Sequence, residues 1–152
     1  MFFLGYIKII LIYLTGIFVH ELGHIISMLI LGGNPTVGFL SVGGTVPSIE
    51  VYYISLISGF FAELIFGIII AFVGFIKRLI SIYFGGFLCI YNALLYYLVF
   101  SPLLKEGDYY NLTIYFRFNF FAINLALILF LCLFACIHII GTTKIMFYKK
   151  LG

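Results

Sequence analysis

The chain has 152 residues, of which 65% are hydrophobic and only 9% are charged, and its mean hydropathy is +1.30. Soluble domains are about half apolar and a quarter charged, so this composition excludes a water-soluble globule, a disordered chain and a basic nucleic-acid-binding protein. Because a membrane-spanning helix needs about 20 apolar residues, the length predicts one domain over residues 1–152: an all-α polytopic membrane protein with about four transmembrane helices in a lipid bilayer.

The first apolar run covers residues 4–31 and predicts the first transmembrane helix. It is too long for a cleavable signal peptide, and His20, Glu21 and His24 interrupt it without a small-residue cleavage pattern. The sequence Gly-Gly-Asn-Pro at residues 32–35 ends this helix, because glycine and proline together do not extend one.

Residues 36–48 have a different pattern, in which apolar residues such as Phe39 and Val42 are separated by small or polar ones. This weak alternation predicts a short β-hairpin after the first helix, with its turn at Gly43-Gly44. Strand-like backbone is stable at membrane depth only where protein or water satisfies its polar groups, so the hairpin is expected to dip into the membrane from the interface.

Three further apolar runs, over residues 51–76, 79–104 and 118–143, predict the remaining transmembrane helices. With four helices, Lys105 and Arg117 lie on one side of the membrane, and the other basic residues share the side of the termini: Lys8, Lys77, Arg78, Lys144, Lys149 and Lys150. The positive-inside rule therefore places both termini in the cytoplasm. We expect a multi-pass protein of the plasma (cell) membrane.

The first predicted helix contains the sequence His-Glu-Leu-Gly-His at residues 20–24. Histidines at positions i and i+4 project from the same helical face, which suits two imidazoles that bind one zinc ion. Zinc activates water and polarises a carbonyl group, and Glu21 beside the first histidine can accept the proton of that water. Ionisable groups in an apolar helix are costly unless they pair, bind metal or face water, so we favour a zinc site over a merely satisfied polar cluster.

A catalytic zinc site usually has three protein ligands, so His20 and His24 need at least one more. The sequence offers these candidates: Glu50, Glu63, Glu106, Asp108 and His138. Soluble zinc peptidases often supply a glutamate from a later helix, which favours Glu63. Asp108 follows the helix break at Pro102, where unwound backbone can turn a carboxylate back toward a neighbouring helix.

A second possible metal cluster consists of Cys132, Cys136 and His138 in the last apolar run. Metal sites of this type normally have loop-borne or convergent ligands, so we expect the cysteines to pack as small apolar residues and His138 to be buried and hydrogen-bonded. Cys89 also lies in an apolar run, and an odd number of such thiols does not indicate a disulfide framework.

These motifs resemble the site-2 protease family of intramembrane zinc metalloproteases, and the resemblance covers nearly the whole chain. The motif at residues 20–24 in a membrane helix, followed by a glycine-rich hairpin, is similar to the first core element of that family. Residues 58–63 resemble its second motif, and the series Asn92, Pro102 and Asp108 resembles its third. The resemblance implies that Asp108 is the third zinc ligand.

The chain departs from the family pattern at several of these positions. Phe60 stands where the family has a proline, and Glu63 stands where it has an asparagine. In the family motif the carboxylate residue precedes the glycine, but here Gly107 precedes Asp108. Glu106 and Glu63 are therefore fallback ligands. Members often carry an extra soluble domain, which we do not expect in a chain of this length.

The resemblance implies an intramembrane endopeptidase that cleaves membrane-anchored proteins with one zinc ion (Zn2+) per chain. The ligands would be His20, His24 and Asp108, and Glu21 would serve as general base and later as proton donor. Its partners would be a transmembrane protein substrate and the bilayer. Four-helix members commonly begin outside the cell, which is opposite to the orientation that the Lys/Arg count predicts; active-site placement slightly favours the family orientation.

Three residues are weaker candidates for substrate contacts. Gly43 and Gly44 lie in the hairpin, which can pair with an unwound, extended substrate. Asn92 can hydrogen-bond the substrate backbone or the developing oxyanion, and a role in helix packing is equally compatible with the sequence.

Two functions of other classes stay open. A catalytically inactive relative can act as a scaffold for membrane proteins, which the order of Gly107 and Asp108 favours and an intact Glu21 disfavours. A small metal-ion carrier can use a relay of polar residues: His20, Glu21, His24 and Glu63.

Overall fold

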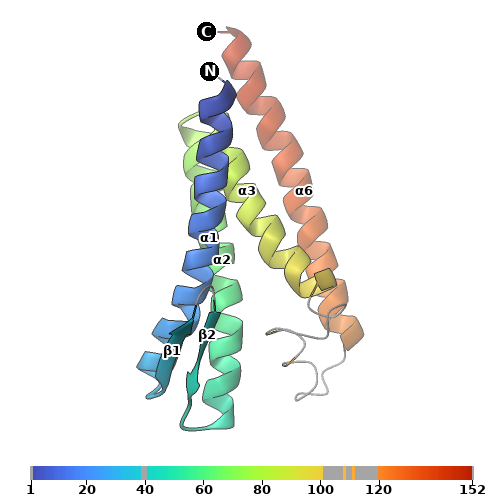
Figure 1. Cartoon of the computed structure of the whole chain (residues 1–152). Helices are drawn as coiled ribbons and strands as arrows, with labels where there is room; N and C mark the ends of the chain where they lie inside the picture. Colours follow the sequence, from blue (N-terminus) through green and yellow to red (C-terminus); the bar gives the residue numbers. More distant parts are fainter. Residues whose placement is uncertain (1, 39–40, 101–107, 109–110, 112–119, 152) are drawn as a thin grey trace.

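The structure is a computed structural model that describes residues 2–38, 41–100, 108, 111 and 120–151. Its elements in chain order are α1 (Phe2–Ile30), β1 (Asn34–Gly38), β2 (Ser41–Thr45), α2 (Ile49–Ile76), α3 (Ile80–Leu95), the π-helical turn η1 (Tyr96–Phe100) and α6 (Phe120–Leu151). Both chain termini lie at one end of the molecule, and the hairpin of β1 and β2 lies at the other (Figure 1).

Among the described residues, four helical segments are long and apolar enough to cross a membrane: Phe3–Ile30, Ile49–Ile76, Ile80–Leu98 and Asn124–Phe147. The predicted fold, with four such helices and a two-stranded hairpin after the first, is confirmed. Large apolar side chains on these helices, such as Phe18, Ile65 and Phe72, are 54–62% exposed in the isolated chain. Extensive exposed apolar surface of this kind suits contact with lipid.

The last two helices show details that the sequence did not predict. The α-helical geometry of α3 ends at Leu95 and passes into η1, and the predicted boundary at residue 104 lies outside the described residues. Helix α6 extends to Leu151 instead of ending at residue 143, because the residues between include neither proline nor glycine.

Small residues allow α1, α2 and α3 to pack closely. A Cβ atom at Gly23 would lie 2.6 Å from the carbonyl oxygen of Ser58, and one at Gly67 would lie 2.9 Å from that of Gly86. Such contacts are typical of membrane helices, in which van der Waals packing takes the place of water exclusion. The three helices therefore form a tight unit that fixes the relative positions of their polar side chains.

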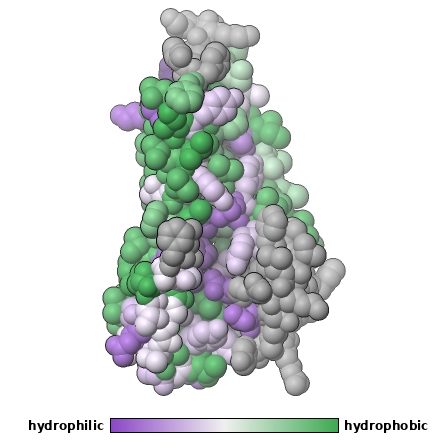
Figure 2. Space-filling view, viewed as in Figure 1, coloured by the Kyte–Doolittle hydropathy of each residue, from purple (hydrophilic) through white to green (hydrophobic). Residues whose placement is uncertain are grey.

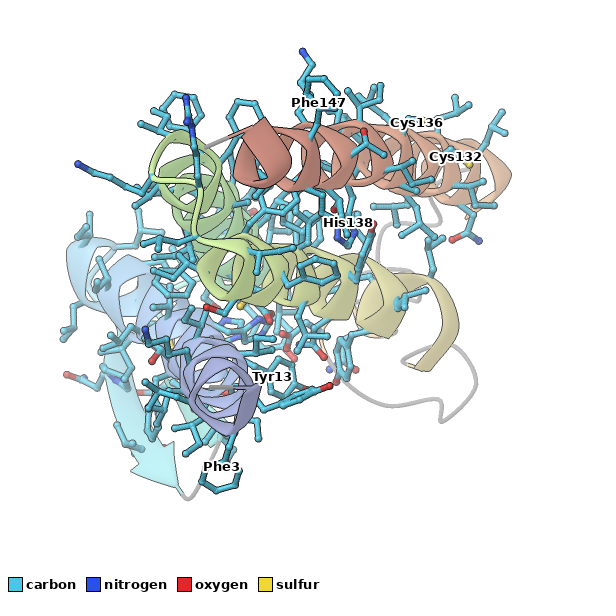
Figure 3. All side chains as sticks on the ribbon, turned by 90° about the horizontal axis from the view of Figure 1, so that it is seen from above. Phe3, Tyr13, Cys132, Cys136, His138 and Phe147 are labelled. Carbon is cyan, nitrogen blue, oxygen red and sulfur yellow. The ribbon has the colours of Figure 1, made fainter. Side chains whose placement is uncertain are left out.

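Helix α6 packs against α3 through aromatic rings. His138 stacks on Phe87 with ring centroids 4.4 Å apart, and its Nδ1 lies 2.9 Å from the hydroxyl of Tyr91. The hydroxyl of Tyr83 donates to the carbonyl of Ile137 at 3.0 Å. Figure 3 shows His138 on the side of α6 that faces α3. The hydrogen bond predicted for His138 is confirmed, but the residue is half-buried where full burial was expected.

The three cysteines lie in different surroundings. Cys89 is fully buried, whereas Cys132 and Cys136 are exposed and lie on the outer side of α6 (Figure 3). Among the described residues, Cys132 and Cys136 form no group with His138 that is close enough to hold a metal ion. The second metal cluster considered from the sequence is therefore not assembled.

The hairpin follows α1 as predicted, but its turn does not lie at Gly43-Gly44. The strand register pairs Gly43 with Thr36 and Gly44 with Pro35, so both glycines lie inside β2. Gly44 has a φ of +140°, and a Cβ atom there would collide with the backbone of β1. Glycine is needed at this position for close approach of the two strands, which the sequence pattern did not distinguish from a turn.

Candidate metal centre

Three side chains with metal-ligating atoms meet beside α1: His20, His24 and Asp108. The four-residue spacing places both histidines on one helical face, with ring centroids 4.8 Å apart. One ligand atom from each of the three residues lies within 4.8 Å of the others. In the part of the chain that the structure describes, this is the one group of His, Cys, Asp or Glu side chains with such proximity.

The distances within this group fit a small cation. The Nε2 atoms of His20 and His24 lie 3.5 and 3.1 Å from Oδ2 of Asp108. Tetrahedral ligands at the usual zinc distance of about 2.1 Å are about 3.4 Å apart. The two histidine–aspartate distances are close to this value, and all three ligand atoms lie within 4.8 Å of one another. A small shift of the side chains would therefore let them surround one metal ion and leave a fourth position for water or substrate.

Each histidine uses its other ring nitrogen in a hydrogen bond to α2. Nδ1 of His24 lies 2.6 Å from the carbonyl oxygen of Ser55, and Nδ1 of His20 lies 3.2 Å from Oε2 of Glu63. Since both acceptors require a proton on Nδ1, the lone pair of each neutral imidazole lies on Nε2. That tautomer is the one that can bind a metal beside Asp108.

Gly59 of α2 provides the space for both imidazole rings. A Cβ atom at this position would collide with the ring of His24 and lie 2.9 Å from Nε2 of His20. The absence of a side chain at Gly59 therefore allows the histidines of α1 to reach their partners on α2.

The charge of Asp108 also suits a metal ligand. Burial raises the pKa of this carboxyl group, but hydrogen bonds and charge interactions with the protonated forms of His20 and His24 outweigh burial and hold the pKa below its ordinary value. Asp108 is consequently ionised at neutral pH, the form in which a carboxylate binds metal.

The candidate ligands line two adjoining cavities. The larger, of about 330 Å³, is lined by both histidines, Glu21 and Asp108. The second, of about 250 Å³, is lined by His24, Asp108 and residues of β2. Figure 2 shows hydrophilic residues in a broken band along the middle of one face, which reaches into the half of the molecule that carries the hairpin. Glu21 thus shares a polar cavity with all three candidate ligands.

The other candidates for the third ligand lie elsewhere. Glu63 contacts the Nδ1 side of His20 and is not part of the group around Asp108. Glu50 is exposed at the start of α2, and His138 is bonded to Tyr91. Glu106 lies outside the described residues.

The weaker substrate candidates border the same cavities. Gly43 and Gly44 line the second cavity, and Asn92 lines the first. The amide of Asn92 is engaged inside the protein, because it donates to Oε1 of Glu63 at 2.8 Å and accepts from the Tyr13 hydroxyl at 3.1 Å. This arrangement supports a structural role for Asn92.

The sequence assigned no role to three residues that the site uses: Tyr13, Ser55 and Gly59, although Gly59 lies in the motif at residues 58–63. Helical spacing carries a signal for each of them. Tyr13 is seven residues before His20, and Ser55 and Gly59 precede Glu63 at intervals of four. Each therefore lies on the same helical face as a residue already singled out.

Neither a family model, nor a curated protein, nor a solved structure matches this chain.

Proposed function

We propose that this protein is an intramembrane zinc metalloendopeptidase that cleaves membrane-anchored proteins. The observation that carries the proposal is the convergence of two imidazole nitrogens and one carboxylate oxygen in a cavity that Glu21 also lines. The sequence resemblance to the site-2 protease family supports the same activity.

The donor set suits zinc. Two neutral imidazoles and one carboxylate are ligands that zinc prefers, whereas magnesium and calcium favour sites made entirely of oxygen ligands. Three protein ligands leave one position for chemistry, which distinguishes catalytic zinc sites from closed structural ones. Zinc, when bound, would supply a Lewis acid that polarises the scissile carbonyl and acidifies water.

Side chains of the protein would hold the metal and transfer the proton. His20, His24 and Asp108 hold the metal, and the bonds to Ser55 and Glu63 keep both imidazoles in the required tautomer. Glu21 accepts a proton from the attacking water and returns it to the leaving amine.

The substrate in this proposal is an extended segment of a membrane-anchored protein. Helical backbone is a poor substrate, because its carbonyl groups are already hydrogen-bonded. Both cavities are bordered by His24, Asp108 and Val42 of β2. A peptide paired along β2 would place neighbouring side chains in the two cavities and a peptide bond beside the metal ligands.

The test uses the purified protein reconstituted in lipid vesicles with transmembrane test substrates. The Glu21→Gln variant should retain about one zinc per chain and lose cleavage by a factor of about 100 or more, because it lacks the general base. Glu50→Gln, which changes an exposed glutamate at the start of α2, is the matched control and should cleave like the wild type.

Three outcomes would contradict the proposal. Cleavage that persists in Glu21→Gln would remove the assigned base. A wild-type protein that binds no zinc after supplementation would favour a catalytically inactive scaffold. Metal flux across the vesicle membrane that Glu21→Gln abolishes, in the absence of cleavage by the wild type, would favour a metal-ion carrier.

A further inference from the structure

A buried carboxylate lies behind one of the candidate ligands. Glu63 is 2% exposed, and its Oε2 lies 3.2 Å from Nδ1 of His20, the ring nitrogen that does not face Asp108. Its other oxygen accepts a hydrogen bond from Asn92 at 2.8 Å, and Asn92 accepts one from Tyr13 at 3.1 Å. These hydrogen bonds join α1, α2 and α3 in one continuous network.

The two histidines therefore depend on different kinds of support. Nδ1 of His24 is held by a backbone carbonyl, that of Ser55, which no side-chain substitution removes. Nδ1 of His20 is held by the side chain of Glu63. A substitution at the hydrogen-bond partner can therefore change the orientation of His20 but not that of His24, and it leaves both histidines in place.

We propose that Glu63 is a positioning residue that orients His20 for metal binding, an inference that rests on the function proposed above. A carboxylate that accepts the Nδ1 proton fixes the ring orientation and increases the basicity of Nε2. Because Glu63 and Asp108 contact opposite nitrogens of the same ring, Glu63 supports a ligand and is not itself one.

The rest of the network keeps Glu63 in this position. A buried carboxylate needs hydrogen-bond donors, and Asn92 supplies one while its own carbonyl is fixed by Tyr13. A glutamine at position 63 can replace the carboxylate if its side-chain oxygen accepts from His20 and its amide NH2 group donates to the side-chain oxygen of Asn92. The Asn92 amide must then flip and donate to the Tyr13 hydroxyl, which can also act as an acceptor.

The experiment measures zinc affinity by chelator competition in detergent-purified full-length protein, together with the absorption spectrum of the cobalt-substituted form. Glu63→Leu should weaken zinc binding by about 10–100-fold and alter the cobalt spectrum, because His20 loses its fixed orientation. Glu63→Gln should lose less than about tenfold, because the flipped network still provides an acceptor for His20.

The control separates positioning from general stability. Tyr83→Phe removes a hydrogen bond between α3 and α6 without touching the network, so it should lower the melting temperature of the metal-free protein and leave zinc affinity unchanged. Wild-type zinc affinity and an unchanged cobalt spectrum in Glu63→Leu would overturn the positioning role, whatever its melting temperature.

A second set of variants covers the case in which Glu63→Leu does not fold. Asn92→Asp alone places a second carboxylate against Glu63 without a donor between them, and it should weaken zinc binding. The double variant Glu63→Gln/Asn92→Asp restores a donor and an acceptor at that contact. Its loss of zinc-binding free energy should therefore be smaller than the sum of the losses in the two single variants. Strict additivity would overturn the proposal.

The two proposals fail in different ways. A wild-type chain that binds neither zinc nor cobalt overturns the proposed function and, with it, the role of Glu63. A wild-type chain that binds zinc, with variants at position 63 that bind it equally well, overturns only the role of Glu63.

Discussion

Gly59 shows how a single residue determines whether the candidate site can form. Both imidazoles of α1 occupy the space in which a side chain at this position would lie. In contrast, a Cβ atom at Gly5 of α1 would meet only the Ser81 side chain of α3, at an ordinary distance of 3.9 Å. The two glycines therefore form a matched pair for testing the role of this space.

We predict that Gly59→Ala weakens zinc binding by about tenfold or more, because a small displacement of catalytic groups has large functional effects. Gly5→Ala should bind zinc like the wild type. Zinc content after dialysis against a weak chelator measures both. Equal zinc retention by the two variants would show that the site has room for a methyl group.

Asp108 is the candidate ligand that sequence reasoning could not assign uniquely. We predict that Asp108→Ala and His24→Ala each lose the zinc ion, since each removes one of the three proposed ligands. Asn111→Ala changes a neighbour that lines the second cavity and should retain it. Elemental analysis of the purified proteins provides the measurement, and zinc loss in His24→Ala alone would move the third ligand from Asp108 to Glu106.

At the scale of elements, α6 differs from the other helices. Its contacts with α3 include the aromatic cluster around His138, and Gly141 lies directly against the ring of Tyr83. None of the three candidate ligands belongs to α6. Packing of this helix and formation of the metal centre are therefore separable.

We predict that Gly141→Leu displaces α6 and destabilises the protein by about 1–3 kcal/mol, the usual cost of overpacking. Zinc affinity should stay within about twofold of the wild type, because the metal centre lies on other elements. Cys136→Leu, on the exposed side of the same helix, is the control. Thermal unfolding in detergent measures stability, and a parallel loss of zinc affinity would show that α6 supports the centre.

At the scale of the whole molecule, the arrangement of the helices bears on membrane orientation. Both termini and the connection between α2 and α3 lie at the end opposite the hairpin (Figure 1). Lys8 lies near the start of α1, and Lys77 and Arg78 lie in the connection between α2 and α3, so they belong to this end of the molecule. Lys144 lies in the last turns of α6. The family resemblance and the charge distribution predict opposite orientations.

The structure gathers these basic segments at the end that carries both termini, so we now favour the orientation from the Lys/Arg count over the family orientation and predict cytoplasmic termini. Basic residues near the ends of transmembrane helices are retained on the cytoplasmic side. A fluorescent protein fused to the C-terminus should therefore fluoresce, and alkaline phosphatase fused there should be inactive. The opposite pattern would support the orientation implied by the site-2 protease family and would place the hairpin in the cytoplasm.

The amino-acid sequence by itself determined the four helices and the pairing of His20 with His24. Both follow from local rules, since long apolar runs favour helices in lipid and a four-residue spacing places side chains on one helical face. Only the tertiary structure decided the position of the hairpin turn, the proximity of Asp108 and the partners of Glu63. Those features depend on contacts between distant segments, such as Tyr13 with Asn92, 79 residues apart. Local periodicity carries no information about which helical faces meet, because helix packing decides that.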